Sequence, residues 1–129
     1  MARYRVGVIS DTHGLLRPEA AAALASCRLI LHAGDVGGPE VLDGLRRIAP
    51  VVAVRGNLDF GPWADALREW ETVEVGGVRI HLRHIFEARD NDDAQVVITG
   101  HSHQPSLARA DGVLHLNPGS AGPRRFLLP

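Results

Sequence analysis

The stretch VVITGHSH, residues 96–103, carries the clearest indication of the fold. Its first four residues are β-branched and run into Gly100, a pattern typical of a strand that is buried on both faces. Successive side chains of a strand alternate, so a backbone that stays extended past Gly100 would point His101 and His103 to the same side. Open α/β sheets bind ligands at the ends of such strands. Taken alone, however, the pair is more commonly explained as two exposed loop histidines. The residues at the ends of the other strands are needed to distinguish this explanation from a ligand site.

The first half of the chain alternates predicted strands and helices. Short apolar runs predict strands at Arg5–Ser10, Leu29–His32 and Val51–Val54. Proline opens each of the two helices predicted between them, at Pro18 and at Pro39. This β-α-β-α-β order predicts parallel strands that are joined by right-handed crossovers.

The second half changes to hairpins. Gly76-Gly77 separates two strand-like runs, 70–75 and 78–82, and Asp111-Gly112 separates the runs 106–110 and 113–116. Both dipeptides are typical of two-residue turns in antiparallel hairpins. The chain therefore predicts an α/β fold with either one mixed sheet or two sheets packed face to face.

Length and composition limit the possible functions. The 129 residues predict a single domain, residues 1–129, and a net charge of −1 gives no electrostatic argument for a stable nucleic-acid partner. The one cysteine, Cys27, cannot form an internal disulfide, and no leader or membrane-spanning run is visible, so we expect a cytoplasmic protein without a membrane partner. All 14 basic residues are arginine, which excludes Schiff-base and P-loop lysine chemistry.

Five of the predicted strands end in side chains that can bind metal ions. The successive strand ends carry Asp11 and His13, Asp35, Asn57, His84, and His101 with His103. Each residue alone has an ordinary explanation as a cap, a turn or a strand histidine, but their joint occurrence does not. Oxygen and imidazole donors without thiolates suit manganese, iron, zinc, nickel or magnesium. Seven donors suit two ions that share a carboxylate, and Asp35 is the central candidate for that bridge.

The remaining histidines are predicted to be structural. His32 precedes the Gly34-Asp35 turn, where a hydrogen bond from its ring would support the ligands. His81 and His115 lie in the middle of predicted strands and are expected to have no role at the site.

In order and spacing these residues resemble the calcineurin-like metallophosphoesterase superfamily. The motifs that carry the resemblance are Asp11-x-His13, Gly34-Asp35-x-x-Gly38, Gly56-Asn57-x-Asp59, His84 and Gly100-His101-Ser102-His103. The Gly-Asn-x-Asp form and the closing Asn117-Pro118-Gly119-Ser120 are similar to the small prokaryotic phosphodiesterase branch of that superfamily. The resemblance extends from the first strand to Ser120, which is nearly the whole chain.

The resemblance implies an α/β fold in which a sandwich of mixed β-sheets is flanked by helices. It also implies two divalent metal ions, manganese first and nickel, iron, zinc or magnesium as alternatives. One ion is assigned to Asp11, His13 and His103, the other to Asn57, His84 and His101, and Asp35 to both. The ions would activate a bridging hydroxide that hydrolyses a small or nucleotide-type phosphodiester.

Asp59 and Asn57 are the candidate catalytic residues, and Asn57 is also one of the predicted ligands. Larger members of the superfamily have a histidine after the asparagine, which helps to protonate the leaving group. Here that position holds Leu58, and Asp59 beyond it is the candidate acid, with a purely structural turn role as the equal alternative. Arg55 and Arg17 are candidate phosphate contacts because of their charge.

Three features depart from the pattern of the superfamily. Ile85 follows His84 where relatives usually have glycine, and the connection Ile85–Asp93 is short for a parallel crossover. If these departures displace His84, the second ion loses a ligand. The chain also stops at Phe126–Pro129, where relatives continue, so the fold is expected to be truncated at its C-terminus. This apolar end would pair with a sheet edge or with a second copy, and we therefore expect a homo-oligomer.

Two other functions remain open on the sequence. A non-catalytic metal-binding scaffold on the same fold would resemble the retromer subunit that is built this way; the shortened region after His84 favours it, and the full donor set opposes it. A serine hydrolase would use Ser102, whose surroundings are close to a nucleophile elbow. Gln104 stands where that elbow requires its final glycine, which argues against this function.

Overall fold

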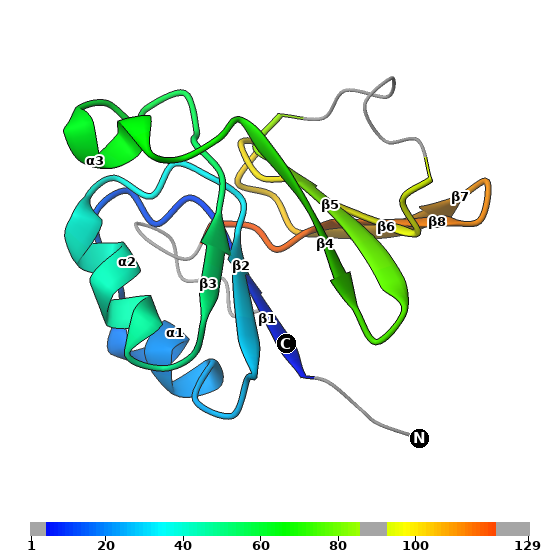
Figure 1. Ribbon diagram of the computed structural model, residues 1–129, viewed down its shortest axis with the longest axis horizontal. Coiled ribbons are helices and arrows are strands. Elements are labelled where there is room, and N and C mark those ends of the chain that lie inside the picture. The colour runs from blue at the N-terminus through cyan, green and yellow to red at the C-terminus, as the bar shows by residue number, and fades with distance from the viewer. Residues whose placement is uncertain (1–4, 86–92, 121–129) are drawn as a thin grey trace.

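The computed structural model describes residues 5–85 and 93–120, which form two stacked β-sheets with helices against the outer face of one of them (Figure 1). The strands of the first sheet are β1 (Val6–Ile9), β2 (Leu29–His32) and β3 (Val51–Ala53). The helices are α1 (Pro18–Ala23), α2 (Pro39–Arg46) and α3 (Pro62–Asp65). The second sheet contains β4 (Trp70–Val75), β5 (Val78–Arg83), β6 (Val96–Ile98), β7 (Ser106–Ala110) and β8 (Val113–Asn117). The predicted sandwich of mixed sheets is confirmed.

The first sheet follows the predicted β-α-β-α-β order. Its strands are parallel in the order β1-β2-β3, with Val8 opposite Leu31 and Leu31 opposite Val52. All three helices begin with proline in the first turn. Backbone N–H groups in the first turn have no partner within the helix, so proline costs no hydrogen bond there. β2 has its predicted bounds, whereas β1 is two residues and β3 one residue shorter than predicted, which affects only their ends.

The central strand β2 is buried on both faces, as its continuous apolar run predicts. Ile30 packs with Leu45 of α2 on the helix side, and Leu31 packs with Leu82 and Ile98 of the second sheet. Each of these side chains is at most 2% exposed, and burying one contributes roughly 1.5–3 kcal/mol. The contacts of this strand hold the helix layer and both sheets together.

The second sheet has the order β4-β5-β6-β8-β7 and is mixed. The two predicted hairpins are present, because β4 pairs antiparallel with β5 and β7 pairs antiparallel with β8. Strands β5 and β6 are parallel neighbours, with Leu82 opposite Ile98. The connection between them is therefore long enough for a parallel pairing, although residues 86–92 of it lie outside the described residues.

The carboxyl ends of β1, β2, β5 and β6 meet at one edge of the sandwich. The backbone N–H of Asp11 donates to the carbonyl of Gly34 at 3.0 Å, which joins the loops after β1 and β2. The N–H of Gly100 donates to the carbonyl of His84 at 2.9 Å, which joins the ends of β6 and β5. Residues that are far apart in the sequence are thereby brought to one place.

Two expectations, one about the C-terminal end and one about the membrane, are compared only with the described residues. The predicted pairing of Phe126–Pro129, and the truncation and oligomer expected from it, lie outside the described residues. Among the helices of the described ranges, none is long and apolar enough to cross a membrane.

Candidate metal centre

Two groups of metal-binding side chains lie at the edge where the strand ends meet. The first group contains Asp11, His13, Asp35 and His103, and the second contains Asp35, His84 and His101. Within each group the candidate ligand atoms all lie within 4.8 Å of one another. Six of the seven predicted ligands thus fall into two groups that share Asp35, and the seventh, Asn57, lies beside His84.

Asp11 presents a buried carboxylate oxygen to the first group. Its Oδ2 accepts hydrogen bonds from Ser10 Oγ at 2.5 Å and from the backbone N–H of His101 at 3.1 Å. Its Oδ1 is buried and has no hydrogen-bond partner among the described residues, while Nε2 of His103 lies 3.2 Å away. A buried carboxylate oxygen that is left without a donor is costly, and a bound cation removes that cost.

Asp35 lies between the two groups and is almost fully buried. Its Oδ1 accepts a hydrogen bond from the backbone N–H of Leu58 at 2.9 Å. Its Oδ2 lies 3.3 Å from Nε2 of His84 in the second group and 3.9 Å from Nε2 of His13 in the first. This placement is suited to a carboxylate that serves two cations.

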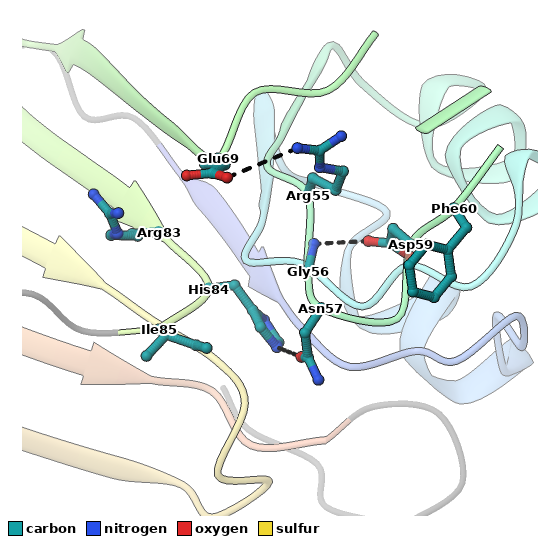
Figure 2. Close-up of a pocket in the computed structure, with 9 residues that line it drawn as sticks. All are labelled: Arg55, Gly56, Asn57, Asp59, Phe60, Glu69, Arg83, His84 and Ile85. Atoms are coloured by element: carbon teal, nitrogen blue, oxygen red, sulfur yellow. Dashed lines mark hydrogen bonds and ion pairs between the residues drawn. The ribbon is translucent and has the colours of Figure 1, made fainter. Parts of the chain in front are cut away.

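The second group is built on His84, whose ring is fixed by the backbone of the residue that follows β2. The ring Nδ1 donates to the carbonyl oxygen of Ala33 at 2.7 Å, because a carbonyl can only accept. In the neutral ring Nε2 then carries a lone pair, and it lies 3.0 Å from Oδ1 of Asn57 (Figure 2). Ile85 follows this histidine and is half exposed, and His84 nevertheless lies with Asp35 and His101 in the second group.

Asn57 faces the same point with either end of its amide. With Oδ1 towards His84, three acceptors, including Asp35, surround one position, which is the environment of a cation. With the amide turned over, Nδ2 donates to Nε2 of His84 at 3.0 Å and to both oxygens of Asp35 at 3.3 Å. Asn57 can therefore act as an oxygen ligand or fill the site as a hydrogen-bond donor.

The first group also brings two imidazole nitrogens together. Nε2 of His13 and Nε2 of His103 are 3.2 Å apart, and the rings meet edge to face with their centroids 5.0 Å apart. Both side chains are partly exposed, whereas Asp11 and Asp35 beneath them are buried. The site thus has buried carboxylates beneath partly exposed imidazoles. This arrangement suits a divalent cation that must also bind a ligand entering from solvent.

The backbone at the site adopts a conformation that most residues avoid. The φ angles are positive at Asp11, His13, Asp35, His101 and His103, between 52° and 72°. Residues held in this left-handed region store strain that the surrounding structure must compensate, and such residues are concentrated at functional sites. The chain consequently does not stay extended past Gly100: His103 joins the first group and His101 the second, so the same-side pair expected for an extended backbone is wrong.

Two glycines allow the loops to approach the carboxylates. A Cβ atom on Gly56 would collide with the backbone nitrogen and Oδ1 of Asp35. A Cβ atom on Gly100 would collide with Ser10 Oγ and lie 2.8 Å from Oδ2 of Asp11. Larger residues at these positions would push the loops away from the site.

His32 supports the loop that carries Asp35. Its Nδ1 accepts from the backbone N–H of Gly34 at 3.1 Å, so its Nε2 carries the proton and donates to Oγ1 of Thr12 at 3.0 Å. The Thr12 hydroxyl in turn donates to the carbonyl of Val36 at 2.8 Å. Complete burial lowers the pKa of His32 from 6.5 to about 3, so the ring is neutral, in agreement with its predicted supporting role.

Asp59 joins two of the loops that carry predicted ligands. Its carboxylate accepts from the backbone N–H groups of Val36 at 3.2 Å, Gly37 at 2.9 Å and Gly56 at 2.9 Å. These contacts supply the structural role that the sequence left open for Asp59. Its role as an acid stays a prediction.

A cavity of about 510 Å³ opens beside the second group (Figure 2). Its lining comprises Arg55, Gly56, Asn57, Asp59, Phe60, Glu69, Arg83, His84 and Ile85. Of the two arginines singled out from the sequence, Arg55 lines this cavity and Arg17 does not. Phe60, Glu69 and Arg83 carry no sequence motif, and only the folding of β4 and β5 against the loop after β3 brings them here.

Other polar residues near the site were predicted differently or not at all. The hydroxyl of Ser102 bonds with Asn117 Nδ2 at 3.0 Å and with the backbone of Gln104, so within the described ranges no histidine is placed as its base. Ser120 Oγ donates to the carbonyl of Asp11 at 3.0 Å, which ties the Asn117–Ser120 motif to the first group. His81 belongs to neither group and stacks on Trp70, and its structural role stays a prediction.

These features are those of an α/β protein with a divalent-metal site, and comparisons with known proteins specify the class. The sequence matches the family described as "Calcineurin-like phosphoesterase superfamily domain" over residues 4–129. A protein named "Probable metallophosphoesterase" from Methanothermobacter thermautotrophicus is 37% identical over 131 residues, which cover 89% of this chain and 76% of that protein. The chain belongs to the calcineurin-like phosphoesterase superfamily.

Solved structures agree with this assignment. Wild-type Vps29 from Entamoeba histolytica in complex with Zn²⁺ superimposes with a TM-score of 0.74 at 29% identity, covering 92% of this chain and 77% of that one. Yfce, a phosphoesterase from E. coli, superimposes with a TM-score of 0.68 at 28% identity, covering 90% of this chain and 79% of that one. The recognised family and the predicted fold class are therefore confirmed.

Proposed function

We propose that the chain hydrolyses phosphodiesters with two divalent cations, one held by each of the two groups that share Asp35. The observation that carries this proposal is the buried pair of carboxylates: Asp11 keeps one oxygen without a donor, and Asp35 lies between both groups. When bound, such cations lower the pKa of a water that attacks phosphorus and neutralise charge on the phosphoryl oxygens. Asp11, His13 and His103 would hold one cation, and Asn57, His84 and His101 the other.

The residues of the chain have separate tasks in this proposal. The two carboxylates provide negative charge in a buried place, where a divalent cation is bound most strongly. The carbonyl of Ala33 fixes the ring of His84, and the carboxylate of Asp59 accepts backbone N–H groups from the loops that carry Asp35 and Asn57. His101 is exposed and marks the side from which a substrate reaches the site.

The cavity beside Asn57 and His84 supports a diester rather than a monoester. A diester carries a second organic group next to the phosphorus, and a cavity of about 510 Å³ that shares residues with the second metal group can receive it. A monoester has only one organic group, so it cannot place a second one in this cavity in addition to its leaving group.

The test is hydrolysis of bis(p-nitrophenyl) phosphate and p-nitrophenyl phosphate after removal of metal and addition of Mn²⁺. We expect metal-dependent turnover that is faster for the diester, and a loss of about 100-fold or more in Asp35→Asn. The matched control is Asp43→Asn, which changes an exposed aspartate paired with Arg46 and should leave the rate unchanged. Absence of turnover in the wild type, or full activity in Asp35→Asn, would refute the proposal.

The metal-binding scaffold is the second candidate, and the likeness to Vps29 is the observation that favours it. Such a protein would bind metal and hydrolyse no diester. Zinc joins manganese as a metal to be tried, because the Vps29 structure holds it. The cytoplasmic location of the chain and its assembly into a homo-oligomer stay predictions.

A further inference from the structure

The cavity beside the second metal group is lined by two arginine side chains and by an exposed aromatic ring. Arg55 and Arg83 lie on its walls, Glu69 lies near Arg55, and Phe60 stands at its rim (Figure 2). His84 belongs both to the cavity and to the second group, and Asn57 lies beside it in the cavity, so a phosphorus bound at the metals would have this space next to it. Its lining therefore contacts whichever ester group the substrate places there.

Arg55 is fixed at its backbone, but among the described residues its side chain has only a weak partner, Glu69. Its N–H donates to the carbonyl of Arg68 at 2.7 Å, beside the bridge between Val54 and Arg68 that links the loop after β3 to the segment before β4. Its guanidinium lies 3.8 Å from Glu69, and the side chains of this pair are 37% and 69% exposed. An ion pair this long and this exposed contributes little, so an incoming anion can replace Glu69 as the partner of Arg55.

Phe60 is the most exposed large apolar side chain in the described part of the chain, at 73%. Its backbone is not loose, because the preceding residue, Asp59, accepts three backbone hydrogen bonds from the loops around it. An aromatic ring held open to solvent at the rim of a cavity is suited to stacking with a planar ring of a ligand.

The combination points to one chemical class of ligand. We propose that the cavity binds one ester group of the substrate and selects a nucleoside that carries a second phosphate, with its base against Phe60 and its second phosphate at Arg55 and Arg83. The volume of about 510 Å³ is in the range of pockets that hold one small ligand, so it suits a single nucleotide unit. This inference rests on the proposed phosphodiesterase function and specifies its substrate.

The kinetic test compares three p-nitrophenyl phosphodiesters that share a leaving group. Their other ester group is methyl, thymidine through its 5′ oxygen, or the same thymidine with a 3′-phosphate. We expect kcat/KM to rise in that order, by about tenfold or more over the series. Arg83→Gln should abolish the rise in kcat/KM that the 3′-phosphate produces. Phe60→Ala should abolish the rise in kcat/KM that the thymidine produces.

Two matched variants control for unspecific effects. Arg79→Gln removes another arginine of β5, one that is paired with Glu74, and Leu107→Ala removes an exposed apolar side chain of β7. Both should keep the order of the three substrates. A wild type without that order, or a loss in Arg83→Gln and Phe60→Ala that is equal for all three substrates, would overturn the inference.

A binding test separates this inference from the proposed function. Calorimetry with thymidine 3′,5′-bisphosphate should show binding that weakens about tenfold in Arg83→Gln and in Phe60→Ala, even if no diester is hydrolysed. If no diester is turned over, the proposed function fails; if diesters are turned over but the bisphosphate does not bind, only the inference fails. Single-stranded decathymidylate distinguishes a free nucleotide from a polymer: it should compete weakly, and competition stronger than that of the bisphosphate would overturn the selection of a small substrate.

Discussion

Nδ1 of His84 donates a 2.7 Å hydrogen bond to the carbonyl oxygen of Ala33, and this bond sets the second metal group. It fixes the tautomer, so Nε2 is directed with its lone pair towards Asp35 and Asn57. The neighbouring Gly34 is needed for this contact, because a Cβ atom there would lie 2.7 Å from the same Nδ1. The imidazole is thus held from the opposite sheet, by the residue that follows β2, and with Ile85 after it His84 still lies beside Asp35 and His101.

His84→Gln should remove one of two bound ions. Glutamine has no imidazole lone pair at the position of Nε2, so the second group loses a ligand while the first keeps all of its own. We expect about two manganese ions per chain in the wild type and about one in the variant by elemental mass spectrometry, with the affinity for the lost ion reduced about 100-fold or more. His115→Gln, a substitution in the middle of β8, is the control. Two ions retained in His84→Gln would mean that His84 is not a ligand.

Gly56→Ala should disturb the bridge between the two groups. The added methyl would collide with the backbone nitrogen and Oδ1 of Asp35, which have no room to move within buried loops. We expect a loss of roughly 1–3 kcal/mol in the free energy of unfolding and weaker manganese binding, measured by urea titration and by calorimetry. Gly38→Ala is the matched control, since its methyl meets only the flexible carboxylate of Glu40. Equal effects of the two substitutions would show that the contact with Asp35 is unimportant.

Much of this architecture could be predicted because it follows from periodicity and turn chemistry. The apolar run Leu29–His32 is buried on both faces, and Asp111-Gly112 does turn a hairpin. The predicted donors lie together because parallel strands carry their carboxyl ends to one edge of a sheet. The directions of His101 and His103 could not be predicted in this way, since their positive φ angles depend on contacts with distant loops.

The partners of the ligands were also beyond the reach of sequence patterns. The acceptor for His84 is a backbone carbonyl, that of Ala33, and any residue type provides one. Ser10 is a common residue at a strand end, and nothing in its neighbourhood marks it as a donor to Asp11. Phe60 and Arg83 meet at the cavity only after strands from different parts of the chain have packed, so their pairing has no local signal.

Asp59→Asn should reveal a structural rather than an acidic role. The asparagine has one acceptor oxygen where the carboxylate has two, so at least one of three backbone N–H groups loses its partner, at a cost of roughly 1–3 kcal/mol in stability. We expect kcat to fall by the same factor for a diester with a p-nitrophenolate leaving group and for one with an alkoxide leaving group. A fall confined to the alkoxide would instead identify Asp59 as the acid, because only a poor leaving group needs the proton.

The stability of the protein should decrease on acidification because of His32. Burial lowers the pKa of this ring to about 3, whereas in the unfolded chain it is 6.5. Between these two values the unfolded chain binds a proton that the folded chain does not, so the free energy of unfolding falls as the pH falls. The full stabilisation is present above about pH 6.5, and the decrease below it approaches about 1.4 kcal/mol per pH unit from this residue alone.

His32→Gln separates this effect from that of the carboxylates, which also titrate on acidification. Glutamine can still accept from Gly34 and donate towards Thr12, but it binds no proton, so the variant should be less stable at pH 7.5 and should lose less stability between pH 6.5 and pH 4.5. Urea unfolding in the presence of a chelator measures how the free energy of unfolding changes with pH in the wild type and in the variant, without a contribution from bound metal. Parallel slopes in the wild type and the variant would show that His32 does not couple protonation to folding, and the neutral ring inferred from its hydrogen bonds would then be wrong.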